Sequence, residues 1–140
     1  MQGGRGLQAL AARINDTIER AQQRPGLVGE AHGLAQALQA LGSATRAAWA
    51  TGEPEAALAN ATPYLQAFGH VVIAWIWLDV AITLDAARES APEGPRRVSL
   101  QGHRAACQYF HRYELPRVAA WLQVVRSRDD TCRTMDEAAF

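Results

Sequence analysis

Cys107 and His111 come closest to forming a nucleophile and its base. They lie four positions apart, so one helical turn would bring the thiol near the imidazole. Cys107 also falls on an apolar stripe, however, and we expect it to be a small core residue. Cys107 and Cys132 are both expected to be reduced thiols, because two cysteines outside a CxxC motif make no disulfide framework. The sequence therefore predicts no catalytic residue.

The histidines do not follow a metal-binding pattern. His32, His70, His103 and His111 are scattered, and neither HExxH nor Glu-x-x-His occurs. His111 and Glu114 would share one helical face, but a single pair supplies too few ligands for a metal ion. We expect polar surface roles for His103 and His111, and no bound metal.

Asp79 is the most unusual polar residue, because it interrupts an apolar run over 71–84. An ionised carboxylate is costly to bury unless it is paired. We expect an ion pair or hydrogen bond with one of three arginines on the last helix, Arg104, Arg112 or Arg117. The alternative is that Asp79 belongs to a polar site at a domain or subunit contact.

Trp75 and Trp77 also lie in the apolar run over 71–84, and on a helix their side chains would point about 200° apart. Both are expected in the core, with the alternative that one of them reaches a partner interface. The candidate buried polar or interface residues are therefore Asp79, Trp75, Trp77, Arg104 and Arg112.

The run over 71–84 also determines the predicted architecture. It is apolar on every helical face apart from Asp79 and Thr83, so neighbouring helices should surround it. It is shorter than the roughly 20 residues that cross a bilayer, and we expect no membrane span. The helix should have two seams, that is, two rows of residues that each face a set of neighbouring helices, in this chain or in a second subunit. One seam consists of Leu65, Phe68, Val72, Trp75, Asp79, Ile82 and Ala86. The other consists of Ile73, Trp77, Val80 and Leu84.

The remaining periodicities predict an all-α, single-domain chain over residues 1–140, folded as an up-and-down four-helix bundle with short extra helical turns. Thr62 is expected to cap the central helix with Pro63 at its first position. Pro116 should kink or interrupt the last helix. The expected helices cover 5–23, 27–49, the stretch from Thr62 to the 91–95 loop, and the stretch from Ser99 onward, with short turns over 54–59 and near Met135.

The charge balance excludes some partners. Fourteen basic and fourteen acidic residues cancel, which argues against nucleic acid or an anionic membrane as the main partner. The first residues contain no apolar h-region of a signal peptide, so we expect a cytoplasmic protein.

Three stretches carry a family resemblance. Residues 61–69 read Ala-Thr-Pro-Tyr-Leu-Gln-Ala-Phe-Gly and lead into the Val-Val…Trp run, and residues 109–116 read Tyr-Phe-His-Arg-Tyr-Glu-Leu-Pro. The tail is acidic, rich in small residues, and closes on Phe140. Together they resemble the C-terminal helical domain that follows the catalytic body in one branch of acyl-CoA dehydrogenases, the 3-methylmercaptopropionyl-CoA dehydrogenase type.

The resemblance implies a chemistry that lies outside this chain. Members of that family oxidise an acyl-CoA thioester, as a Glu removes the α proton and a hydride passes to FAD. The resemblance implies an accessory domain that docks on the catalytic domain and supports a homo-oligomer, with FAD bound only in the full-length context and no cofactor here. The alternatives are a free-standing helical dimerisation module and a small bundle that binds an acyl ligand.

Overall fold

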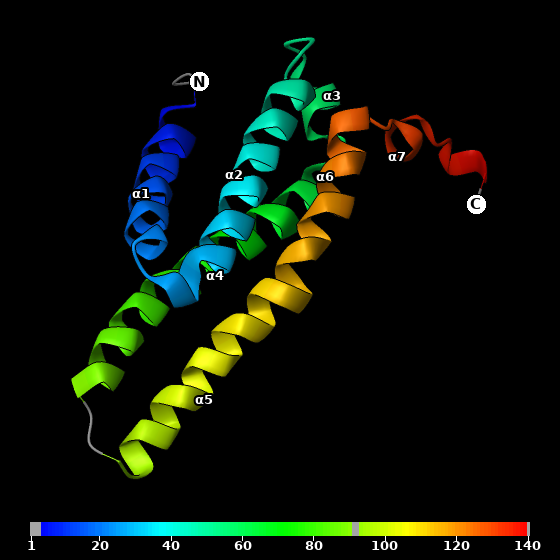
Figure 1. Cartoon of the computed structure of the whole chain (residues 1–140). Coiled ribbons are helices and arrows are strands. Elements are labelled where there is room, and N and C mark those ends of the chain that lie inside the picture. Colours follow the sequence, from blue (N-terminus) through cyan, green and yellow to red (C-terminus); the bar gives the residue numbers. More distant parts are fainter. Residues whose placement is uncertain (1–3, 91–92, 140) are drawn as a thin grey trace.

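The computed structural model describes residues 4–90 and 93–139, and the regular structure in these ranges is entirely helical. Four long segments run alternately up and down (Figure 1), which confirms the predicted all-α bundle. The long segments are α1 (Arg5–Gln22), α2 (Val28–Ala48), α4 (Ala61–Ser90) and the pair α5 (Pro95–Tyr109) and α6 (Val118–Ser127). The short elements are η1 (Pro25–Leu27), α3 (Pro54–Leu58), α7 (Thr131–Thr134) and η4 (Glu137–Ala139).

Helix α4 is central and packs against α1, α2, α5 and α6. Its inward side is built on three fully buried alanines at a seven-residue spacing, Ala67, Ala74 and Ala81, which we call the alanine face. Small side chains let the neighbouring helices approach α4 closely. Among the residues of the two predicted seams only Ile82 is buried, whereas Phe68, Trp75 and Trp77 are partly buried and pack against the core. The seams therefore do not describe the packing of α4 within this chain.

The opposite side of α4 is apolar and open. Leu65 is 65% exposed and Ile76 is 52% exposed, so the helices of this chain do not surround α4 on all sides. Val71 and Leu78 share the packed side with the alanines, whereas Leu65, Ile73, Ile76 and Val80 lie outside. We call this surface the α4 outer face, and it comprises Leu65, Gly69, Val72, Ile73, Ile76 and Val80.

By length and composition, α4 is long and apolar enough to cross a membrane. The length argument made from residues 71–84 is therefore wrong, since the helix continues beyond both ends of that run. A core helix passes the same test. In α4 the alanine face is packed, and 28% of the most apolar window is buried.

Helix α4 begins at Ala61, so the prediction of Thr62 as its cap is wrong. The Tyr64 N–H donates to the Asn60 carbonyl at 3.2 Å, which places Asn60 at the cap position. The Asn60 side-chain amide donates to the Asp129 carbonyl at 2.7 Å. Asn60 thereby ties the start of α4 to the segment that follows α6.

The last long segment is interrupted at the predicted place, although it begins at Pro95 rather than at Ser99. A π-helical turn, η2 (Phe110–Glu114), and a 3-10 turn, η3 (Leu115–Arg117), separate α5 from α6. Pro116 has no N–H with which to continue an α-helix. The Leu115 N–H donates to the Phe110 carbonyl, the five-residue step of a π-helix. The interruption at Pro116 is confirmed.

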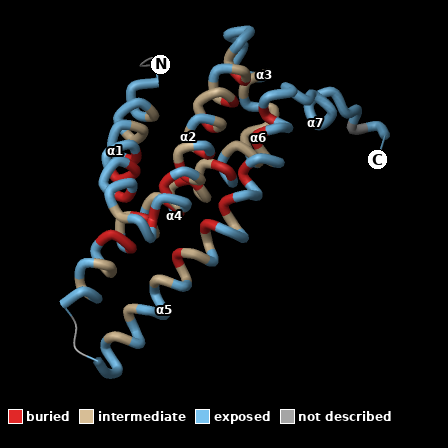
Figure 2. Tube along the Cα trace, viewed as in Figure 1, coloured by how far each residue is buried: buried red, intermediate tan, exposed pale blue. Residues whose placement is uncertain are grey.

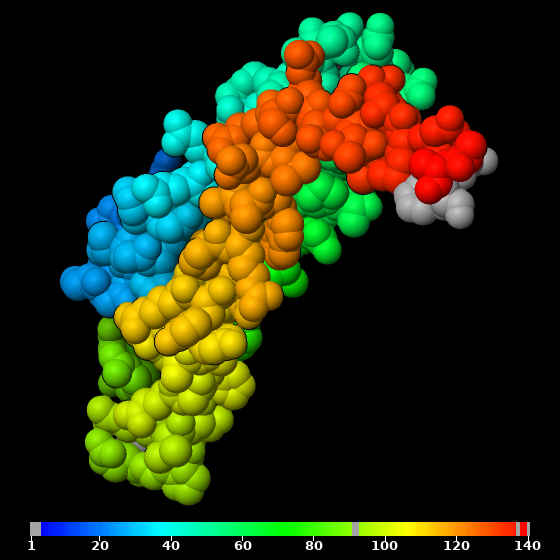
Figure 3. Space-filling model, turned by 90° about the vertical axis from the view of Figure 1, so that its right-hand side faces the viewer, coloured from blue at the N-terminus to red at the C-terminus, as the bar shows by residue number. Residues whose placement is uncertain are grey.

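The ends of the molecule extend away from this core. The C-terminal end of α4 and the N-terminal end of α5 reach past α1 and α2 (Figure 1). Buried residues concentrate where the long helices face one another, whereas α7 is exposed (Figure 2). Figure 3 shows α5 and α6 as one continuous ridge, beyond which the C-terminal segment projects.

We expect Ala74→Leu to lower the free energy of unfolding by about 1–3 kcal/mol, because extra methylenes at a closely packed position force the helices apart. Ala86→Leu is the matched control, since Ala86 is exposed on the same helix. Urea unfolding of both variants measures the difference. Equal stability of the two variants would contradict close packing at the alanine face.

Candidate functional site

Asp79 lies in a cluster between α1 and α4. Its carboxylate accepts a hydrogen bond from Arg20, and both side chains are about half exposed (50% and 49%). Arg20 also donates to the Thr17 hydroxyl at 3.3 Å, and the Trp75 indole N–H donates to the same hydroxyl at 2.8 Å. The Arg20 Nε lies 3.2 Å from an Asp16 carboxylate oxygen. The cluster is a satisfied hydrogen-bond network at the surface.

The partner predicted for Asp79 on the last helix is therefore wrong. Arg104 pairs with other acids, Arg117 lies 3.4 Å from Glu114, and Arg112 is exposed. Arg20 is half exposed on α1, and the packing of α1 beside α4 brings it to Asp79. Trp77 is half-buried and packs against the core.

Arg104 is the centre of a second, more deeply buried cluster. Its Nη1 lies 3.1 Å from Glu30 Oε1, and its Nε lies 3.7 Å from Asp85 Oδ1. A third contact is donated to the Gly26 carbonyl in the turn after α1. The three charged side chains are at most 16% exposed. Arg104 therefore joins α5 to α2, to α4 and to the α1–α2 turn at one point.

Cys107 lies one turn after Arg104 and is fully buried. Burial raises the pKa of the Cys107 thiol to about 11, although the neighbouring Arg104 acts in the opposite direction. A protonated thiol is neither a nucleophile nor a metal ligand. The structure thus supports the expectation that Cys107 is a core residue.

His111 is 8% exposed, so the prediction of a surface role is wrong for it, whereas His103 is exposed. The Nε2 of His111 donates a hydrogen bond to the Ala74 carbonyl at 3.1 Å, so Nδ1 of the same ring carries the acceptor lone pair. Within the part of the chain that the structure describes, Nδ1 has no hydrogen-bond partner. Burial lowers the pKa of His111, with the Ala74 bond acting in the opposite direction. Sequence reasoning missed this residue because Pro116 changes the helix register beside it.

A groove of about 340 Å³ lies beside His111, between α2 and the start of α6. Its walls are mainly small and apolar. The residues that line it are Gly33, Gln36, Ala37, Ala40, His111, Leu115, Pro116, Val118 and Ala119. Arg112 lines a neighbouring pocket with Gly29 and Glu30.

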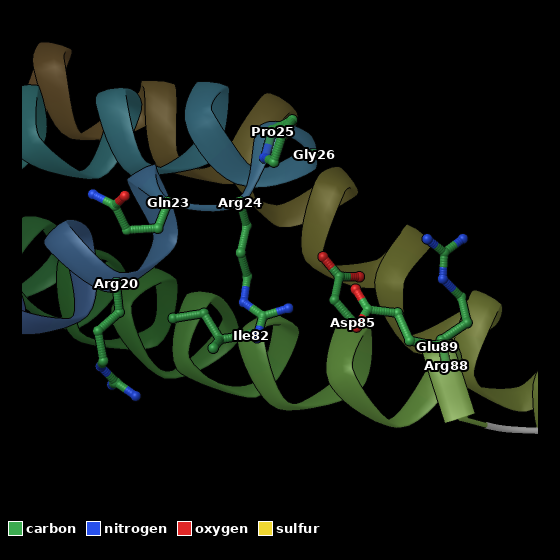
Figure 4. A pocket seen from close by; sticks show the side chains of 9 residues that line it. All are labelled: Arg20, Gln23, Arg24, Pro25, Gly26, Ile82, Asp85, Arg88 and Glu89. Carbon is green, nitrogen blue, oxygen red and sulfur yellow. The ribbon is translucent and has the colours of Figure 1, made fainter.

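A larger pocket of about 640 Å³ opens between the α1–α2 turn and the C-terminal half of α4 (Figure 4). Figure 4 shows Arg24 reaching over Ile82 toward Asp85, while Arg20 points away from it. Glu89 adds a second carboxylate to the same wall. Because the cations do not converge and acids lie between them, the pocket does not form an anion cradle.

Over residues 4–90 and 93–139, no group of three His, Cys, Asp or Glu side chains is placed to hold a metal ion. The polar clusters around Asp79 and Arg104 consist of ion pairs and hydrogen bonds that connect helices. These interactions hold the helices in place relative to one another.

We expect Arg104→Ala to lower the free energy of unfolding by about 3–5 kcal/mol, because it leaves Glu30 and Asp85 as buried carboxylates without their cation. Asp79→Ala is the control and should cost at most about 1 kcal/mol, because its ion pair is half exposed. Chemical denaturation checks both values. A larger loss for Asp79→Ala than for Arg104→Ala would refute this ranking.

We expect His111 to make the fold less stable in acid. The folded ring has a pKa below the usual 6.5, so the unfolded chain binds the proton more readily. The stabilisation is complete above the unfolded pKa and is lost as the pH falls toward the folded pKa. His111→Gln should reduce the drop in unfolding free energy between about pH 7.5 and about pH 5.

His32→Gln is the matched control for that measurement, because His32 is an exposed residue of α2. It should keep the wild-type pH dependence. The same pH dependence in His111→Gln as in wild type would contradict the assignment to His111.

Comparison with known proteins places this helical arrangement in a family. None of the curated proteins matches the chain. The model of the family described as Acetyl-CoA dehydrogenase C-terminal like matches residues 10–136, from the first turns of α1 to the end of α7 and beyond. The chain therefore belongs to this acyl-CoA dehydrogenase C-terminal family. Membership implies that the chain associates with acyl-CoA dehydrogenase domains.

Proposed function

We propose that this chain is the accessory C-terminal domain of an FAD-dependent acyl-CoA dehydrogenase-like protein, and that it serves docking and assembly. Family membership supports the association with a dehydrogenase domain. The observation that carries the assembly role is the α4 outer face, an apolar surface that no part of the described chain covers. Exposed apolar surfaces of this kind mark contacts with other proteins.

The chemistry of such a protein would reside in its catalytic domain. In this proposal FAD and the acyl-CoA bind there, and this chain contributes no cofactor ligand. The buried, protonated Cys107 and the helix-joining ion pairs of Arg104 are consistent with that division. The 3-methylmercaptopropionyl-CoA branch and a cytoplasmic location are further parts of the proposal, and both rest on the sequence.

A binding experiment tests the proposal. The chain is mixed with a purified, FAD-loaded dehydrogenase domain of the same family, and sedimentation gives the molar mass of the particle. We expect a complex larger than one chain on one dehydrogenase domain. Ile76→Glu, in the α4 outer face, should reduce its mass, whereas Gln66→Glu on an exposed polar position of the same helix should not.

An activity measurement complements the binding data. The chain alone, mixed with FAD and an acyl-CoA, should show neither a bound-flavin spectrum nor reduction of an electron-accepting dye. Turnover by the chain alone would overturn the proposal. Failure to associate with the dehydrogenase domain would do the same and would favour the free-standing interaction module.

The groove beside His111 favours a second candidate, an acyl-binding bundle. Its apolar walls suit an aliphatic chain, and Gly33 leaves room in its floor, because a Cβ there would meet only Leu115 at 3.8 Å. Titration with a medium-chain acyl amide, followed by calorimetry, tests this function. Binding that Gly33→Leu abolishes and Gly102→Leu on α5 preserves would support it.

A further inference from the structure

We propose that the groove beside His111 binds an aliphatic molecule whose head is a small, uncharged hydrogen-bond donor, namely a primary alcohol or a primary amide. The head would donate to His111 Nδ1, and the aliphatic chain would lie between α2 and the start of α6. The inference rests on the acyl-binding function named above as the second candidate, and it specifies the head group that the groove recognises.

His111 supplies a hydrogen-bond acceptor that the protein does not use. The Ala74 carbonyl accepts and never donates, so the proton of the neutral ring is on Nε2 and the lone pair is on Nδ1. Burial lowers the pKa of His111, which keeps the ring neutral near pH 7. Among the described residues, none donates to Nδ1. A buried acceptor without a donor is costly, so a ligand that brings a donor gains affinity.

The unused acceptor faces away from α4. The two nitrogens of an imidazole lie on different edges of the ring, and Nε2 is directed at α4 through its bond to Ala74. His111 lines the groove of about 340 Å³ and also the neighbouring pocket of about 250 Å³, and Gly33 is the other residue that both share. The two hollows therefore meet at His111. Nδ1 itself has almost no exposed surface, so only a small head group can approach it, with a slight shift of a wall side chain.

The walls of the groove suit an aliphatic chain rather than water. Apart from His111, Gln36 is the lining residue with a polar side chain, and it is exposed. A water molecule held inside a protein typically makes about three hydrogen bonds, and the side chains of this groove do not offer that number. At roughly 30 Å³ for each non-hydrogen atom, the groove holds about ten of them. A molecule with one donor and a medium-length aliphatic chain matches these walls.

Small residues of α2 open the floor on which the chain would lie. Gly29, Gly33 and Ala37 follow one another at four-residue spacing and line the two hollows in turn. A Cβ at Gly29 would meet no heavy atom within 4 Å, and one at Gly33 would meet only Leu115 at 3.8 Å. Packing within the described chain therefore does not require glycine at either position, although glycine is less stable than alanine inside a helix. The open space is available to a ligand.

The acceptor also disfavours an ionised acid as the ligand. A carboxylate only accepts hydrogen bonds, so it would set its oxygens against the lone pair of His111 Nδ1. Arg112 is the cation that could attract it, but Arg112 lines the neighbouring pocket and is exposed. Water competes strongly with an ion pair at such a position. The groove should therefore select an uncharged head over a charged one.

Calorimetric titration of the whole chain near neutral pH, with ligands of matched size, tests the head group. The alcohol n-octanol donates a hydrogen bond, whereas heptyl methyl ether has the same number of non-hydrogen atoms and only accepts. We expect n-octanol to bind about tenfold more tightly than the ether, because the ether leaves Nδ1 unpaired. Octanamide should bind like the alcohol, and octanoate should bind more weakly than either.

Three variants connect this preference to the groove. His111→Phe keeps a ring but removes the acceptor, so it should bind n-octanol and the ether equally. Gly33→Leu should abolish binding of both ligands, because the leucine fills the junction of the two hollows. Gly102→Leu, at an exposed position of α5, is the matched control and should change neither affinity. Thermal melts verify that the variants fold.

Nitrogen NMR of the His111 ring gives a measurement on the unmodified chain. We expect n-octanol to shift the Nδ1 resonance, because its lone pair then accepts a hydrogen bond, while Nε2 keeps its proton. The ether should leave the Nδ1 resonance in place. An Nδ1 resonance that n-octanol does not shift, in a chain that binds n-octanol, contradicts the contact.

The outcomes separate the inference from the functions proposed above. Equal affinity for n-octanol and the ether in the unmodified chain would refute the head-group preference and leave an apolar groove that binds acyl chains. Octanoate binding as tightly as n-octanol, or a preference that His111→Phe retains, would refute it too. If none of the four ligands binds, the acyl-binding function fails together with the inference. Association with the dehydrogenase domain is tested separately, through Ile76→Glu.

Discussion

The close approach of other helices to the alanine face of α4 is the constraint on which the rest of the structure depends. Ala67, Ala74 and Ala81 have no exposed surface, and their small size lets α4 pack against four other helices at once. Ala74 has a second role, because its carbonyl accepts a hydrogen bond from the buried His111 imidazole. The same arrangement leaves Leu65, Ile73, Ile76 and Val80 exposed on the other side, while Val71 and Leu78 pack inward beside the alanines. One packing choice thus produces both the core and the α4 outer face.

Two further devices hold the last segment against this core. The π-helical turn before Pro116 changes the helix register, so that Cys107, His111 and Leu115 all face inward despite the proline. Arg104 joins α5 to α2 and α4 through two nearly buried carboxylates. Buried ion pairs of this kind fix the relative position of the helices more than they stabilise the fold, because the cost of removing the charges from water offsets most of their mutual attraction.

The functional picture follows from what these groups do. The polar side chains that first suggested chemistry, Asp79 and Arg104 among them, connect helices. The described surface also has two apolar features, the α4 outer face and the groove beside His111. The family associates the chain with acyl-CoA dehydrogenase domains, and the assembly role that we propose would use the α4 outer face.

The sequence by itself determined the helices and the interruption at Pro116, because these depend on local patterns of proline, glycine and apolar spacing. The family followed from the resemblance of whole stretches of sequence, which the family match over residues 10–136 confirms. The sequence did not determine which side of α4 is buried. That helix is apolar all round, so periodicity predicts no orientation, and only packing against the other helices selects the alanine face. The Arg20 partner of Asp79 and the burial of His111 were likewise decided by tertiary structure. Each depends on which helices lie side by side, and no local pattern contains that information.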